Sequence, residues 1–99
     1  MPAFYAESFD REMACTEREW LASLHRAMGD NTCQQVARAL TVRIGEGQLV
    51  LSWRALEPRV AGQVRIPRLL VSFRFSGLDG MQRYAFMKRF DLTMPRSSA

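Results

Sequence analysis

Alternation between apolar and polar residues is the feature of this 99-residue sequence that most restricts its fold. In residues 38–44 the large apolar side chains fall on even positions, whereas in 49–56 and 68–76 most fall on odd positions, Trp53 and Phe73 among them, with Val50 and Leu70 on the other parity. Successive side chains of a strand point to opposite faces of a sheet. Each stretch therefore predicts a strand with one buried and one exposed face.

The connections between these strands differ in character. Gly45-Glu46-Gly47 predicts a tight turn, because glycine accepts the positive backbone angles of hairpins. Residues 57–67 contain two prolines and a glycine and show no period, so we expect a loop. Val64 and Ile66 are even-numbered whereas the next strand is apolar on odd positions, which predicts a change of phase with a bulge or strand start at Pro67.

A helix is predicted from about Thr16 to Gly29. Thr16 and Glu19 form a capping box, in which each residue's side chain accepts a hydrogen bond from the other's backbone N–H. Trp20 and Leu24 belong to an apolar stripe with helical spacing, and Gly29 is suited to the left-handed residue that ends a helix.

The two ends of the chain are less regular. Near the N-terminus, Tyr5, Phe9 and Met13 lie four apart and predict either a short helix or an arm docked on the domain. Residues 79–94 fit two interpretations: a long strand after an Asp-Gly turn, or a helix over 80–88 capped by Asp79 and followed by a strand over 89–94. We favour the second, because most of residues 81–89 are good helix formers.

Together these elements predict an α+β fold in which an N-terminal amphipathic helix packs on an antiparallel sheet of three or four strands. A helix-then-strand element, or one long strand, completes it at the C-terminal end. We expect an N-terminal arm over 1–15, one globular domain over 16–94 and a flexible tail over 95–99, since about 100 residues suffice for one domain.

Charge is divided unevenly along the chain. Residues 1–40 carry four arginines against six acids, a formal charge of −2, whereas residues 41–99 carry nine arginines and Lys88 against four acids, a charge of +6. Thirteen arginines to one lysine fits selection for the planar guanidinium, but the codon bias of a GC-rich genome produces the same excess without any function, and we favour this second explanation.

No pattern in the sequence specifies a reaction. His25 is the one histidine, and ten helical residues would place it about 15 Å from Cys15, beyond hydrogen-bond reach. Cys33 near His25 stays open, although no spacing positions the two together. We therefore expect two free thiols, no catalytic residue, no metal site, no cofactor and no small-molecule substrate, which makes an enzyme the least favoured class.

Six arginines are the candidate partner-binding residues. They lie on the exposed side of the predicted strands or in the predicted 57–67 loop, and they are Arg43, Arg54, Arg59, Arg65, Arg68 and Arg74. Solvated arginines that protect a sheet from aggregation are one interpretation. A second is a nucleic-acid platform, although the face has no aromatic residue on which bases could stack. The third is a surface for an acidic protein or for another copy of the chain.

The third interpretation is our leading hypothesis. It describes a small non-enzymatic interaction or accessory domain that binds an acidic protein surface or itself through the arginine-bearing face. A sequence-nonspecific nucleic-acid-binding module is the alternative. The N-terminal residues do not resemble a secretory signal and no apolar run approaches the ~20 residues of a membrane span, so we expect a cytoplasmic location and no membrane partner.

Overall fold

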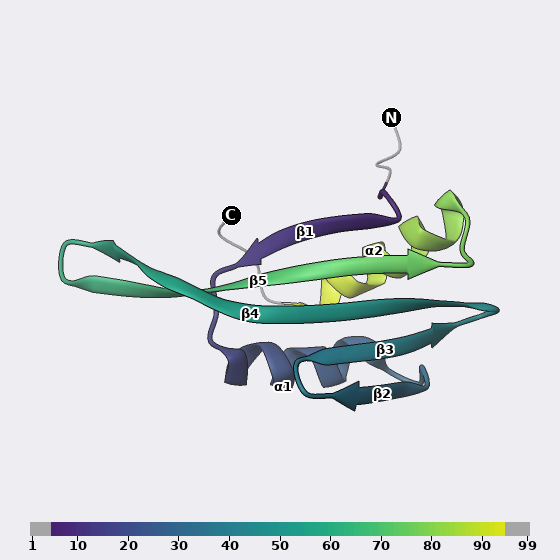
Figure 1. The fold of residues 1–99 in the computed structure, drawn as a ribbon, viewed down its shortest axis with the longest axis horizontal. Coiled ribbons are helices and arrows are strands. Elements are labelled where there is room, and N and C mark those ends of the chain that lie inside the picture. The colour runs from purple at the N-terminus through teal and green to yellow at the C-terminus, as the bar shows by residue number, and fades with distance from the viewer. Residues whose placement is uncertain (1–4, 95–99) are drawn as a thin grey trace.

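The chain forms one antiparallel sheet with two helices on one side of it (Figure 1). This computed structural model describes residues 5–94. In chain order the elements are β1 (Ser8–Met13), α1 (Glu17–Met28), β2 (Cys33–Val36), β3 (Ala39–Ile44), β4 (Gly47–Ala61), β5 (Val64–Ser76) and α2 (Gly80–Thr93). The five strands lie in the order β1-β5-β4-β3-β2, so β1 and β2 are the edges.

The α+β class is confirmed, but the predicted architecture is wrong in strand number and in element order. The sheet has five strands, and the first helix follows a strand instead of opening the fold. Residues 8–13, assigned to an arm, pair with residues 69–74 of β5. Their four-residue spacing at Phe9 and Met13 fits a period of two as well as a helical turn, and the arginine between them obscured the alternation.

Arg11 points to the helix side of the sheet and has partners there. Its guanidinium lies 5.5 Å from the centre of the Phe73 ring and pairs with Asp91 of α2. A charged residue on the buried parity is stable when it is paired and stacked in this way. The edge strand β2 was missed for a different reason, because Cys33–Val36 is exposed throughout and has no apolar period.

The helix predicted from Thr16 is confirmed. The Thr16 hydroxyl accepts from the backbone N–H of Glu19, whose carboxylate accepts from the Thr16 backbone N–H. Glu17, in the first turn, also accepts hydrogen bonds from Arg38 at 3.0 Å and from the Trp53 indole at 2.9 Å, and these two contacts lower the pKa of its carboxyl group. They tie the start of α1 to the sheet.

The C-terminal helix is longer than predicted, and the expected strand over 89–94 is wrong. Asp79 caps α2 through a capping box with Gln82, as one of the two interpretations required. The helix continues to Thr93 because Phe86, Phe90 and Met94 recur every four residues and are all buried. Leu92, which made the stretch alternate, is 81% exposed.

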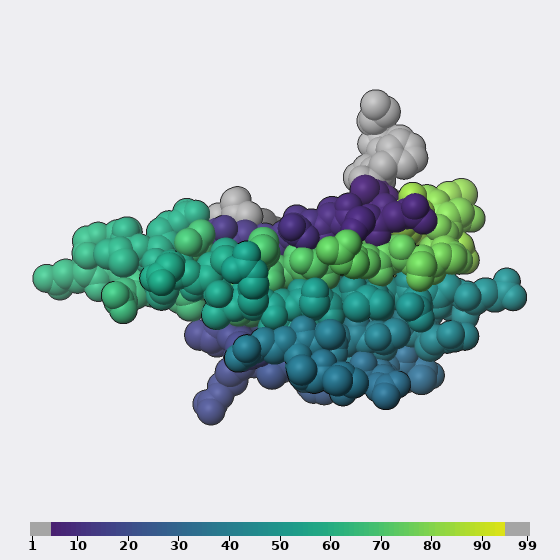
Figure 2. All heavy atoms as spheres, in the orientation of Figure 1, coloured from purple at the N-terminus to yellow at the C-terminus, as the bar shows by residue number. Residues whose placement is uncertain are grey.

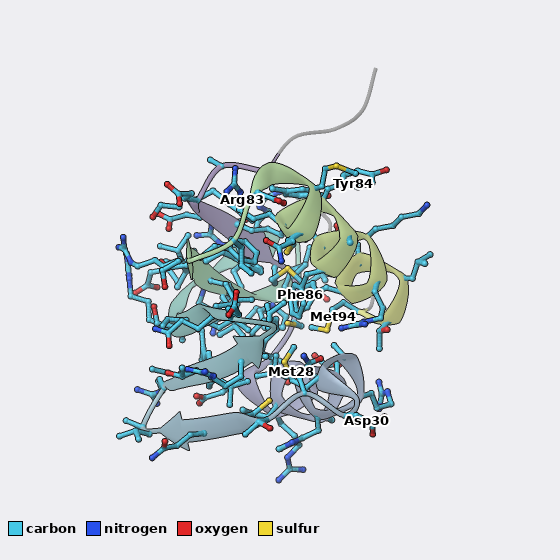
Figure 3. All side chains as sticks on the ribbon, turned by 90° about the vertical axis from the view of Figure 1, so that its right-hand side faces the viewer. Met28, Asp30, Arg83, Tyr84, Phe86 and Met94 are labelled. Atoms are coloured by element: carbon cyan, nitrogen blue, oxygen red, sulfur yellow. The ribbon has the colours of Figure 1, made fainter. Side chains whose placement is uncertain are left out.

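One core lies between the sheet and the helices. Figure 3 views the sheet edge-on, with both helices on one side and Met28, Phe86 and Met94 between them and the strands. Trp53 and Phe73 are buried, as their parity predicted. The Trp53 ring meets that of Trp20 edge-on at 5.7 Å, and among residues 5–94 no group accepts a hydrogen bond from the buried Trp20 indole N–H.

The predicted 57–67 loop is the end of a long hairpin. Residues 57–67 continue β4 and β5 beyond the core as a two-stranded arm, which projects at the left of Figures 1 and 2. The bulge lies in β4 between Leu56 and Arg59, opposite Pro67, whereas β5 runs without a change of phase. Prolines fit where a ladder is interrupted, because they cannot donate to it. Val64 and Ile66 therefore keep the exposed parity of β5.

Candidate functional site

The helices leave one face of the sheet uncovered, and this open face carries the predicted arginines. Figures 1 and 2 view the molecule from this side, with the helices behind the strands. The registers place Arg54 opposite Leu70, Arg74 opposite Val50 and Arg43 opposite Gln48. Directly paired residues share a face. Three strands therefore present arginines to the same side, as the alternation of the sequence predicted.

The six predicted residues fall into three groups. Arg43 and Arg54 are exposed and form no ion pair or side-chain hydrogen bond within residues 5–94. Arg74 donates to the Ser8 hydroxyl at 3.1 Å. The remaining three belong to the arm or its base: Arg59, Arg65 and Arg68.

Glu12 of β1 holds the base of the arm. Its carboxylate lies 2.9 Å from the Arg68 guanidinium and 3.5 Å from that of Arg59. Arg68 also donates to the backbone carbonyl of Glu57 at 2.9 Å, at the bulge. Arg65 pairs with Val60 and projects from the other side of the arm, so the structure separates it from the open face. Arg68 and Arg59 thus brace the arm in the free protein.

The middle of the open face is uncharged. It contains Ser72 beside Ser52, with Val50 and Leu70 on either side along the strands, and Arg74 stands beside Val50 at its border. The small serine side chains leave a depression of about 190 Å³, which Arg54 and Leu70 border. This uncharged area continues across β3 and β2, where it is formed by Ala39, Thr41, Gln34 and Val36. Charged groups thus surround a weakly polar centre.

The open face also has an acidic edge that the sequence interpretation missed. Asp10 pairs with Ser72 and Glu12 with Leu70, so both carboxylates of β1 stand on the face. Asp10 is exposed, and no described side chain pairs with it. The even-numbered acids at 10 and 12 were a readable signal, because they alternate with Phe9, Arg11 and Met13.

A second hollow lies on the helix side of the sheet. It is lined by two residues whose proximity could not be predicted from their spacing in the sequence. His25 of α1 and Cys33 of β2 both line a hollow of about 340 Å³ at the edge of the core. The Cys33 thiol donates to the Asn31 backbone carbonyl at 3.3 Å, and burial raises the pKa of this thiol. Both effects favour the protonated form, which is a weak nucleophile. Cys15 is also a free thiol and is buried, and burial raises its pKa as well.

Labelling of Cys33 by iodoacetamide should therefore be slower at pH 7 than labelling of an unstructured thiol, and its rate curve should be displaced to higher pH. The raised pKa leaves less thiolate at neutral pH, and the fraction grows as pH rises. Mass spectrometry measures the rate of labelling over pH 6–10. The variant Cys33→Ser is the control, because any label that it takes up is on Cys15. Faster labelling than the free thiol at pH 7 would contradict the assignment and favour a reactive cysteine.

Comparisons with protein-family models, with characterised proteins and with solved structures find no match to this chain. Within residues 5–94, neither helix is long and apolar enough to cross a membrane. The same residues contain no group of three or more His, Cys, Asp or Glu side chains placed to hold a metal ion. The candidate site therefore rests on the geometry of the open face.

Proposed function

We propose that this protein is a small interaction domain whose open sheet face binds another protein. The observation that carries the proposal is the composition of that face, an uncharged centre bordered by the guanidinium groups of Arg43 and Arg54, which have no ion-pair partner among the described residues. Protein interfaces have this arrangement, with charge depleted at the centre, arginine enriched and a polar rim. The two arginines would meet carboxylates of the partner, which steers association and sets its orientation.

The two sides of the sheet differ in how their apolar residues are covered, and this difference supports a binding role for the open face. Most apolar residues of the two helices pack inward, with Met81 and Leu92 of α2 as exposed exceptions, and the largest side chains of the core are completely buried. On the sheet side, Val50 and Leu70 are half-buried with no layer above them. A partner that covers them would complete a second layer, which is the usual way for a sheet to bury both faces.

A photo-crosslinking amino acid placed at Ser52 should form a light-dependent adduct with a protein in cells, because position 52 lies at the centre of the open face. The matched control is the same amino acid at Leu92, which is 81% exposed on the helix side. Denaturing electrophoresis measures the adduct. Absence of an adduct at position 52, or an equal yield from position 92, would contradict the proposal.

The arm favours a second candidate function, which is binding to double-stranded nucleic acid. It projects as a two-stranded ribbon, and Arg59 and Arg65 lie on it. A ribbon of this width fits the major groove of DNA, where arginine contacts phosphates and base edges. The outward residues of the described strands include no aromatic side chain, so stacking of single-stranded bases has no support on the open face.

Titration with a short duplex at about 50 mM salt tests this second function, because phosphate contacts are strongest at low ionic strength. Arg65→Ala should weaken binding and reduce the slope of log affinity against log salt by about 1. Arg18→Ala, on the exposed side of α1, is the control. No change in fluorescence anisotropy with the wild-type protein would eliminate the nucleic-acid function.

A further inference from the structure

Strand β2 uses only one of its two sides for pairing. It forms the lower edge of the sheet in Figure 1, and among the described strands it pairs with β3 alone. Just before it, Thr32 accepts a hydrogen bond from the backbone N–H of Arg43, and in an antiparallel ladder such bonds recur at every second residue. The backbone N–H and C=O groups of Cys33 and Gln35 therefore point away from β3, to the outside of the sheet.

The outward backbone groups of β2 have no partner in the part of the chain that the structure describes. Neither the N–H nor the C=O of Cys33 or of Gln35 takes part in a hydrogen bond within residues 5–94. A further strand beside β2, at the usual spacing of about 4.8 Å, would pair with these groups. Extended peptides bind to sheet edges in this way, and the main-chain hydrogen bonds supply affinity.

The two edges of the sheet differ in how they are protected. On β1, Asp10, Arg11 and Glu12 carry charges, which oppose the approach of another strand. β2 consists of a cysteine, two glutamines and a valine, so it has no charge and no proline, and it is exposed along its whole length. Its four residues limit pairing to a short segment. β2 is therefore the edge that can accept a strand.

The hollow between α1 and β2 lies on the side to which an added strand would turn its side chains. Cys33 and Gln35 pair with Val42 and Leu40, and both of these residues are buried on the helix side. Directly paired residues share a face of a sheet, so a residue that bonds to Cys33 or Gln35 from outside would also face the helix side. Cys33, Gln35 and Leu40 line the hollow of about 340 Å³ there. A side chain of the added strand would therefore point toward this hollow.

The lining of the hollow favours an apolar side chain. Leu24, Met28 and Leu40 contribute to it, and all three belong to the core. The rest of the lining is glycine and uncharged or weakly basic polar residues, namely His25, Gly29, Asn31, Cys33 and Gln35. The lining thus contains no carboxylate, amine or guanidinium group. An apolar side chain in the hollow would be removed from water and would add to the affinity of the backbone hydrogen bonds.

A second copy of β2 does not supply such a side chain. On the helix side, the Cys33 thiol donates to the backbone carbonyl of Asn31 and the Gln35 amide donates to that of Ala37, both at 3.3 Å. Both side chains are thus held on their own strand, and two copies joined through β2 would leave both hollows unfilled. Such a contact would also join only four residues of each copy, whereas a stable interface uses about 20–30 residues a side. The observations therefore favour a segment of another protein.

We propose that the outer edge of β2 and the hollow beside it bind an extended segment of another protein, which joins the sheet and places an apolar side chain between α1 and β2. Backbone hydrogen bonds to Cys33 and Gln35 hold the segment, and the hollow gives specificity for the apolar side chain. The site lies at the edge and on the helix side of the sheet. It is separate from the open face and does not depend on the function proposed for that face.

Selection from a phage library of random linear peptides on the full chain tests the proposal. Gln35→Pro should weaken binding of the enriched peptides at least about tenfold, because proline removes an outward N–H that the β2–β3 ladder does not use. Asp10→Pro is the matched control and should not change binding. Glu7 accepts a hydrogen bond from the backbone N–H of Phe75, so the N–H of Asp10 likewise points outward, from the opposite edge of the sheet.

A second pair of variants tests the hollow. Neighbouring residues of a strand face opposite sides, so Cys33→Phe would fill the hollow, whereas Gln34→Phe would place its ring on the open face. Cys33→Phe should weaken binding of the same peptides at least about tenfold, because the apolar side chain of the peptide loses its buried position. Gln34→Phe should leave binding unchanged. Circular dichroism on every variant establishes that each is folded.

Amide hydrogen exchange of the wild type locates the bound peptide without any variant. The amides of Cys33 and Gln35 should exchange at least about tenfold more slowly when peptide saturates the protein, whereas that of Asp10 should not change. A library that yields no binder would overturn the proposal, as would unchanged exchange at Cys33 and Gln35. Peptides that bind Gln35→Pro or Cys33→Phe as tightly as the wild type would overturn it as well. If either variant is unfolded, the exchange measurement decides.

Discussion

Replacing Trp53 with alanine should lower the free energy of unfolding by about 3–5 kcal/mol, the range for removing a buried aromatic ring. Trp53 is 4% exposed, its ring packs edge-on against Trp20, and its indole donates to Glu17. The substitution removes the packing and the link between β4 and α1 together. Small domains unfold with only about 5–15 kcal/mol in total, so a large share of the stability would be lost.

Urea unfolding followed by circular dichroism measures this change. The control is Arg54→Ala on the neighbouring residue, which points to the open face and should change stability by no more than about 0.5 kcal/mol. If Arg54→Ala destabilises the domain as much as Trp53→Ala, the assignment of the two faces is wrong.

Replacing Gly47 with alanine should destabilise the domain by about 1–3 kcal/mol, as expected when a methyl group is forced into a packed site. A Cβ at position 47 would lie 2.5 Å from the Ser76 carbonyl oxygen and 2.7 Å from that of Gly77. Both contacts are backbone atoms, so no side chain can move aside. The start of β4 would have to separate from the end of β5.

Thermal unfolding of Gly47→Ala measures the effect, and Gly80→Ala is the matched control. Gly80 opens α2, and the nearest atom to an added Cβ is the Arg83 guanidinium nitrogen at 3.8 Å. Alanine there should be neutral or stabilising, since it lowers the entropy of the unfolded chain. A stable Gly47→Ala protein would show that the two strand ends are further apart than described.

Parity in the sequence predicted the two faces of the central strands. Trp53 and Phe73 are buried, and Arg43, Arg54 and Arg74 share the other side of the sheet. The reason is that successive side chains of a strand point to opposite faces. The capping boxes at Thr16 and Asp79 located the starts of both helices for a similar reason, since each depends on residues three apart.

Patterns that fit two periods were misread. The four-residue spacing of Phe9 and Met13 fits a strand and a helix, and so does the run of Phe86, Phe90 and Met94. Tertiary contacts chose between the two: β5 offered an open edge to residues 8–13, while the core beside α1 accepted a helix over 80–93. The arm over 57–67 was read as a loop because its bulge breaks the alternation.

The sequence alone thus determined which side chains of each strand face the core and where the helices begin, because these depend on neighbours a few residues apart. The tertiary structure alone decided that Asp10 shares a face with Arg54, that Glu12 braces the arm and that His25 and Cys33 line one hollow. These groupings join residues from separate elements. They are set by strand order and by the packing of the helices, which no local pattern encodes.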